Sequence, residues 1–142
     1  MNRTMLIVED SPIDLKVLKH ALTNAHCDLS LLHYDTADSA LEYLSSIIKS
    51  NSAAVTLPAL VTLDLNLPGM HGLDFLRSVK ADADLAGLPI IIISTSDNPS
   101  DVHNAYQNGA AAYMKKKLSY NEFQEDVNNM VKFWLQTVLL DS

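Results

Sequence analysis

The sequence has little of several residue types that mark specialised classes of protein. Its one cysteine, Cys27, cannot form a disulfide within the chain, so we expect a reducing compartment. Four glycines and five prolines among 142 residues argue against collagen-like and low-complexity chains. Basic residues are also scarce, because 10 Lys and Arg stand against 17 Asp and Glu, for a net charge of −7. This charge disfavours nucleic acids and anionic membranes as partners.

Long apolar runs are missing as well. At the N-terminus, Glu9 and Asp10 follow only four apolar residues, too few for a signal peptide or a membrane span. We therefore expect a cytoplasmic protein with no membrane partner. The length suits one domain over residues 1–142, and a hydrophobic content of 48% is enough for one well-formed core.

What the sequence does contain is an alternation of strand and helix patterns. Short apolar runs predict five strands, at residues 5–8, 29–34, 59–63, 90–93 and 111–114. Helical spacing of apolar residues, with capping residues such as Ser11, Asn98 and Ser119, predicts a helix after each strand, the last running to residue 138. This alternation predicts an α/β fold, a doubly wound parallel sheet covered on both faces.

Polar residues gather where the predicted strands end, which is where parallel sheets place their sites. Glu9 and Asp10 follow the first strand, Asp64 the third and Ser94 the fourth, and Lys116 comes shortly after the fifth. Three clustered carboxylates repel one another unless a cation is bound, and an all-oxygen set suits Mg²⁺. An ionised Asp is also a nucleophile toward phosphorus, and Asp64 is best placed because it ends the central strand.

Four motifs at these positions resemble the receiver domain of two-component response regulators. They are VED at 8–10, LDLNLPGMHG at 63–72, PIIIIST at 89–95 and GAAAYMKK at 109–116. The resemblance covers essentially the whole chain. It is strongest toward stand-alone regulators paired with phytochromes, through DLNLP, the extended loop before the third strand and the tail FWLQTVLL. It implies a flavodoxin-like (βα)5 fold with strand order 2-1-3-4-5.

The resemblance also implies the chemistry of the site. Asp64 would accept a phosphoryl group from a phosphohistidine on a histidine kinase, with a phytochrome as the expected kind of kinase. Asp10, Asp64 and the main-chain carbonyl of Asn66 would bind Mg²⁺, and Glu9 would act through water or at the rim of the site. The chain would then be a signalling switch rather than a metabolic enzyme.

The remaining implied roles concern the response to phosphorylation. Lys116 would pair with the phosphoryl group, and Ser94 would donate its hydroxyl to it, with Thr95 as the rival for that role. Tyr113 would be the aromatic switch residue, which turns inward when Ser94 is drawn to the phosphate. The chain departs from the family at Lys117, where family members have a proline after a cis peptide bond, so the geometry of this loop stays open.

Other interpretations of the same residues remain. Lys116 could belong to a solvated basic run with Lys115 and Lys117, and Tyr113 could be an ordinary half-buried aromatic residue. A phosphorelay shuttle or phosphate sink would use the same chemistry without an output partner, whereas an unphosphorylated pseudo-receiver would only bind partners. A phosphohydrolase with an aspartyl nucleophile needs a second carboxylate two residues on, where this chain has Asn66.

The last predicted helix carries more apolar residues than one face can bury. Beyond the face that covers the sheet, Phe133, Leu135, Leu139 and Leu140 add apolar surface. Exposed patches of this kind mark partner surfaces. We therefore predict a homodimer through the C-terminal helix and tail, about residues 119–142, with contacts from Phe133, Trp134, Leu135 and Leu139. The alternative is that this segment packs back on its own domain.

Overall fold

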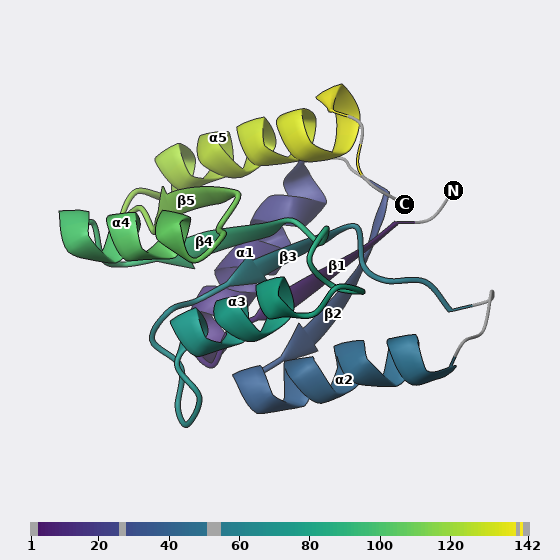
Figure 1. Cartoon of the computed structure of the whole chain (residues 1–142). Coiled ribbons are helices and arrows are strands. Elements are labelled where there is room, and N and C mark those ends of the chain that lie inside the picture. The colour runs from purple at the N-terminus through teal and green to yellow at the C-terminus, as the bar shows by residue number, and fades with distance from the viewer. Residues whose placement is uncertain (1–2, 26–27, 51–54, 139, 141–142) are drawn as a thin grey trace.

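The computed structural model describes residues 3–25, 28–50, 55–138 and 140. Five parallel strands form one sheet: β1 (Arg3–Val8), β2 (Leu29–Tyr34), β3 (Leu60–Leu63), β4 (Ile90–Ser94) and β5 (Ala112–Lys115). Their order across the sheet is β2-β1-β3-β4-β5 (Figure 1). The predicted doubly wound α/β fold and its strand order are thereby confirmed.

A helix follows each strand: α1 (Pro12–Asn24), α2 (Ala37–Ser50), α3 (Gly72–Ala81), α4 (Pro99–Gln107) and α5 (Tyr120–Val131). Figure 1 shows α1 and α5 on one face of the sheet and α2 and α3 on the other. Within the described ranges, no helix combines the length and the apolar character that crossing a membrane requires.

Side-chain caps start four of these helices. Ser11, Asn98 and Ser119 each accept a hydrogen bond from a main-chain N–H two or three residues later, as predicted from the sequence. The start of α3 was not assigned a cap, and there Nδ1 of His71 accepts from the N–H of Leu73 at 3.1 Å. These local bonds set where the helices leave the carboxyl edge of the sheet.

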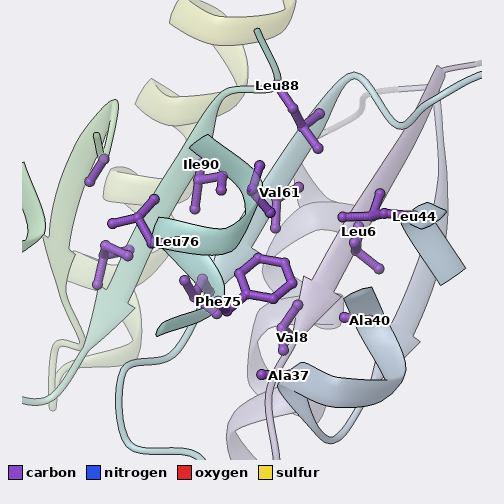
Figure 2. Close-up of a cluster of buried hydrophobic side chains, with 14 of the residues drawn as sticks. Leu6, Val8, Ala37, Ala40, Leu44, Val61, Phe75, Leu76, Leu88 and Ile90 are labelled. Carbon is purple, nitrogen blue, oxygen red and sulfur yellow. The ribbon is translucent and has the colours of Figure 1, made fainter. Parts of the chain in front are cut away.

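The sheet separates two apolar cores. Because successive residues of a strand point to opposite faces, Leu6 and Val8 enter the core under α2, α3 and α4, whereas Met5 and Ile7 enter the core under α1 and α5. Figure 2 shows the first core, with Phe75 of α3 beside Val8 of β1. All of these side chains are almost completely buried, which holds the strand ends in a fixed frame.

The last helix differs from the predicted continuous helix to residue 138. After α5 the chain forms a π-helical segment, η1 (Lys132–Thr137). The hydroxyl of Thr137 donates to the carbonyl of Lys132 at 2.9 Å, and the guanidinium of Arg3 in β1 donates to the carbonyl of Leu135. Both donors bond to main-chain carbonyls of this segment.

This segment also changes the prediction for the apolar surface. Leu135 is buried in the core under α1 and α5, so its assignment to a dimer surface is wrong. Trp134 is half-buried against the same core, and Phe133 remains exposed over 50% of its surface. Leu139 lies outside the described residues. The apolar surface available to a partner is therefore smaller than the sequence suggested.

The approach of α3 to the end of β3 depends on a glycine. The N–H of Gly72 donates to the carbonyl of Leu65 at 3.0 Å, and a Cβ at position 72 would lie 2.6 Å from the carbonyl oxygen of Asp64. No side chain fits there without displacing the main chain that carries Asp64.

Replacing Gly72 with Ala should therefore destabilise the protein. We expect Gly72→Ala to lower the free energy of unfolding by about 1–3 kcal/mol, the usual cost of overpacking, as measured by urea denaturation. The control is Ser78→Ala at an exposed position of the same helix, which should change it by less than about 0.5 kcal/mol. A Gly72→Ala protein as stable as the wild type would contradict the close packing.

Candidate functional site

Strand pairing brings the predicted site residues to one edge of the sheet. Val8 pairs with Leu63, and the next residue on each strand supplies a carboxylate, Glu9 from β1 and Asp64 from β3. The N–H of Asp64 donates to the carbonyl of Val8 at 3.0 Å, which continues the ladder past the end of β3. Between β4 and β5, the N–H of Lys116 donates to the carbonyl of Ser94 at 2.7 Å, just past the end of β5.

The centre of this edge is the ammonium group of Lys116. Its Nζ lies 2.7 Å from Oε1 of Glu9, 2.9 Å from Oδ2 of Asp14 and 3.1 Å from Oδ2 of Asp64. We call these four residues the Lys116 cluster. Glu9 and Asp64 are 6% and 8% exposed, so two of the three ion pairs are largely shielded from water. Such pairs are held more tightly than surface ion pairs, because solvent screens them less.

The cluster has more negative charge than one ammonium can balance. Burial raises the pKa of Glu9 to about 7, because the opposing effect of its hydrogen bond with Lys116 is smaller and nearby Asp64 raises the pKa further. Burial acts to lower the pKa of Lys116, but hydrogen bonds to Asp14 and Glu9 and the charge of Asp64 outweigh it, so its pKa is raised. Lys116 therefore stays charged, whereas Glu9 changes protonation near neutral pH.

The acidic residues at this edge form a set of oxygen donors. One carboxylate oxygen from each of Glu9, Asp10 and Asp64 can be chosen so that all three lie within 4.8 Å of one another. The N–H of Ser11 donates to Oε2 of Glu9 at 3.3 Å, and the N–H of Asn66 donates to Oδ1 of Asp64 at 3.2 Å. Hard cations such as Mg²⁺ take oxygen ligands, so this donor set fits a magnesium ion.

The two predicted switch residues are connected through the loop after β4. Ser94 is fully buried, and its Oγ accepts a hydrogen bond from the N–H of Ser96 at 3.3 Å. The hydroxyl of Tyr113 donates to the carbonyl of the same Ser96 at 2.8 Å. The rival residue Thr95 is exposed. Ser96 thus contacts both Ser94 and Tyr113, a link that the sequence analysis missed.

The three consecutive lysines diverge. Nζ of Lys115 lies 2.9 Å from Asp97 at the surface, and Nζ of Lys117 lies 3.9 Å from Asp126 of α5. Only Lys116 of the three contacts the carboxylates at the sheet edge. The interpretation as a solvated basic run therefore suits Lys115 and Lys117 but does not hold for Lys116. The structure also has no cis peptide bond in its described residues, so the Lys116–Lys117 bond is trans.

Asp14 is the other residue that the sequence analysis missed. Asp14 lies in the first turn of α1, where acidic residues are favoured. The first turn of α1 also faces the end of β5, so the same carboxylate reaches Lys116. Its position three residues after the Ser11 cap is typical of any helix start, so the sequence carries no separate signal for this contact.

Comparisons with known proteins agree with this geometry. The chain matches the family model described as the response regulator receiver domain over residues 5–128. Response regulator Rcp1 of Synechocystis sp. is 29% identical over 138 residues, which cover 97% of this chain and 92% of Rcp1. The crystal structure of the Mn(2+)-bound form of Rcp1 has a TM-score of 0.84 to this chain at 27% identity, over 99% of both chains.

Two further solved structures are similar to this chain over almost its whole length. The phosphorylated cyanobacterial phytochrome response regulator RcpA has a TM-score of 0.89 at 28% identity over 100% of both chains. Response regulator RPA3017, in red light signaling of R. palustris, has a TM-score of 0.89 at 26% identity over 99% of both chains. With five strands in the order 2-1-3-4-5 and acidic residues at their carboxyl ends, the chain belongs to the response regulator receiver domain family and is similar to phytochrome-associated members of it.

Proposed function

We propose that this chain is a phosphorylation-dependent switch that accepts a phosphoryl group on Asp64 from a phosphohistidine of a histidine kinase. The observation that carries the proposal is the buried Asp64 carboxylate, held by Lys116 beside Glu9 at the carboxyl edge of the sheet. A carboxylate with few water contacts is a better nucleophile than a solvated one, and a neighbouring cation offsets the charge of an incoming phosphoryl group.

The transfer itself needs one bond to form and one to break. A carboxylate oxygen of Asp64 forms a bond to phosphorus, the bond between phosphorus and the kinase imidazole nitrogen breaks, and its electron pair stays on that nitrogen. The N–H of Asn66 and the ammonium of Lys116 hold the two oxygens of Asp64 in place for this attack. The product is an acyl phosphate on Asp64.

Magnesium is the proposed cofactor. Glu9, Asp10 and Asp64 would hold it, and the bound ion would offset the negative charge of the phosphoryl group. The pKa of Glu9 is raised mainly by burial, and nearby Asp64 raises it further. A bound cation would favour the ionised form of this buried carboxyl. The main-chain carbonyl of Asn66 is the further ligand predicted from the family resemblance.

The proposed switch runs through Ser96. A phosphoryl group on Asp64 offers new acceptor oxygens to the ammonium of Lys116 and the hydroxyl of Ser94. A Ser94 hydroxyl that turns toward the phosphoryl group gives up its hydrogen bond with the N–H of Ser96. Because Tyr113 is bonded to the carbonyl of Ser96, the position of Tyr113 then changes with the state of Asp64. Phosphorylation shifts an equilibrium between two arrangements of this loop.

The proposed partner is a histidine kinase of the phytochrome type, because the similar regulator RcpA is a cyanobacterial phytochrome response regulator. Two exposed apolar side chains adjoin the Lys116 cluster along the chain. Ile13 precedes Asp14 and is 75% exposed, and Leu118 follows Lys117 and is fully exposed. Apolar side chains beside a polar reaction centre suit a protein donor better than a small phosphate ester.

We also propose that the chain forms a homodimer through the surface of β5, α5 and η1. This surface has a groove of about 390 Å³ lined by residues that include Tyr113, Met114, Phe133 and Trp134. The exposed ring of Phe133 and the half-buried ring of Trp134 make an edge contact, with ring centres 5.3 Å apart. A dimer here would cover apolar surface that its own domain leaves open. Because Tyr113 lines the groove, a change in its position on phosphorylation would alter the dimer interface.

Asp64→Asn should abolish phosphorylation. In the presence of Mg²⁺, acetyl phosphate or a phosphorylated histidine kinase should add a phosphoryl group to the wild type, seen as a mass increment of the intact protein. The control Asp74→Asn removes an exposed carboxylate on α3 and should be labelled like the wild type. Equal labelling of Asp64→Asn and wild type would refute Asp64 as the acceptor.

Magnesium binding should weaken as the pH falls. With the pKa of Glu9 at about 7 in the metal-free protein, Glu9 is protonated below that pH, and a bound cation has to displace the proton. Between pH 8 and pH 6 we expect the affinity to fall about tenfold, the change for one linked proton, as measured by isothermal titration calorimetry. Glu9→Gln should flatten this dependence, and an equally steep dependence in that variant would contradict the assignment.

The dimer is tested by sedimentation at micromolar concentration. We expect the wild type to sediment as a dimer and Phe133→Ser to shift toward monomer, because it removes the most exposed apolar side chain of the groove. Ile13→Ser removes a more exposed apolar side chain elsewhere and should remain dimeric. A wild type that is monomeric with and without phosphorylation would exclude the dimer.

A further inference from the structure

A histidine of the edge strand β2 contacts the main chain that carries two of the acidic residues. Nε2 of His33 lies 2.7 Å from the carbonyl oxygen of Glu9. A carbonyl oxygen can only accept, so Nε2 of His33 carries the proton in this bond. The imidazolium and one neutral tautomer of histidine both have this N–H, so the bond does not depend on the charge of His33. His33 lies outside the Lys116 cluster, and none of the roles proposed above uses it.

Both main-chain polar groups of Glu9 are thereby fixed to β2. The N–H of Glu9 donates to the carbonyl of Tyr34 at 3.1 Å, just past the end of β1. Its carbonyl accepts from the side chain of the adjacent residue, His33. This carbonyl belongs to the same planar peptide unit as the N–H and the Cα atom of Asp10. The His33 ring therefore fixes the plane from which the chain continues into Asp10.

The three acidic residues at this edge differ in how their side chains are held. The carboxylates of Glu9 and Asp64 are each bonded to Lys116, and each also accepts a hydrogen bond from a main-chain N–H. Asp10 is exposed, and within the described ranges no hydrogen bond or ion pair holds its carboxylate. The position of the Asp10 carboxylate is therefore set by its main chain.

We propose that His33 is a positioning residue for the magnesium site, which acts on Asp10 through the peptide unit between Glu9 and Asp10. The inference rests on the proposed function, in which Glu9, Asp10 and Asp64 hold the ion. Replacing a residue that orients a metal ligand commonly lowers metal affinity about 10- to 100-fold. Without the His33 bond, the peptide unit gains freedom, and Mg²⁺ has to order the Asp10 carboxylate when it binds.

The magnesium affinity of His33 variants tests the inference. His33→Phe keeps an aromatic ring and removes the N–H, whereas His33→Gln places an amide N–H near the position of Nε2. By isothermal titration calorimetry at a fixed pH, we expect the affinity for Mg²⁺ to fall about tenfold in His33→Phe and to recover most of this loss in His33→Gln. The control His103→Phe makes the same change at an exposed position of α4 and should bind Mg²⁺ like the wild type.

The outcomes separate this inference from the proposed function. Equal affinities of the wild type and His33→Phe would overturn the inference and leave the magnesium site standing. A loss that His33→Gln does not repair would also overturn it, because the N–H is the group at issue. A wild type that binds no Mg²⁺ would overturn the inference together with the proposed cofactor.

A crystal structure of the wild type with Mg²⁺ decides the matter even if His33→Phe does not fold. We expect His33 to remain bonded to the carbonyl of Glu9 while Asp10 contacts the ion. A His33 ring turned away from this carbonyl, with Asp10 still on the ion, would overturn the inference.

Phosphorylation by acetyl phosphate separates positioning from a general loss of structure. Because His33 acts through the metal site, the rate constant should fall about three- to tenfold in His33→Phe below saturating Mg²⁺ and reach the wild-type value at saturation. A rate that stays low at saturating Mg²⁺ would overturn the positioning role. If the wild type takes no phosphoryl group at all, the proposed phosphorylation fails, while the affinities for Mg²⁺ still decide the role of His33.

Discussion

The ammonium group of Lys116 is the contact on which the site depends. It ties the end of β5 to the loop after β1, to the first turn of α1 and to the end of β3, through Glu9, Asp14 and Asp64. Without this cation, the buried carboxylates of Glu9 and Asp64 would face each other with little water to screen them, and such uncompensated charge is strongly destabilising. The same contact therefore stabilises the sheet edge and holds the carboxylate of Asp64, the proposed phosphoacceptor, within it.

A cluster with three carboxylates around one ammonium responds strongly to any new charge. One ammonium against three carboxylates leaves a proton shared at Glu9 near neutral pH, so a cation is favoured at this edge and a phosphoryl group needs one. The proposed switch has a short route to the surface, because Ser96 is bonded to both Ser94 and Tyr113. In the proposed switch, the charge at the edge of the sheet sets the position of the Tyr113 ring on β5 through these two hydrogen bonds.

Local patterns predicted most of the fold, because strands, caps and helix faces depend on neighbouring residues. The isoleucine run at 90–93 forms β4, and Ser11 caps α1 as expected. The C-terminal helix was predicted less well for a specific reason. The η1 segment is bonded to Arg3, which lies at the other end of the chain, and this contact has no trace in the local sequence. Leu135 is buried by the same tertiary packing.

The sequence by itself determined that acidic and basic side chains would meet at one edge, because the carboxyl ends of parallel strands coincide whatever the details of packing. Only the tertiary structure decided which of three consecutive lysines enters the cluster, and that Asp14 joins it. It also decided that the hydroxyl of Thr62 is buried without a hydrogen-bond partner among the described residues. These outcomes depend on distances between elements far apart in the chain, and no local pattern encodes such distances.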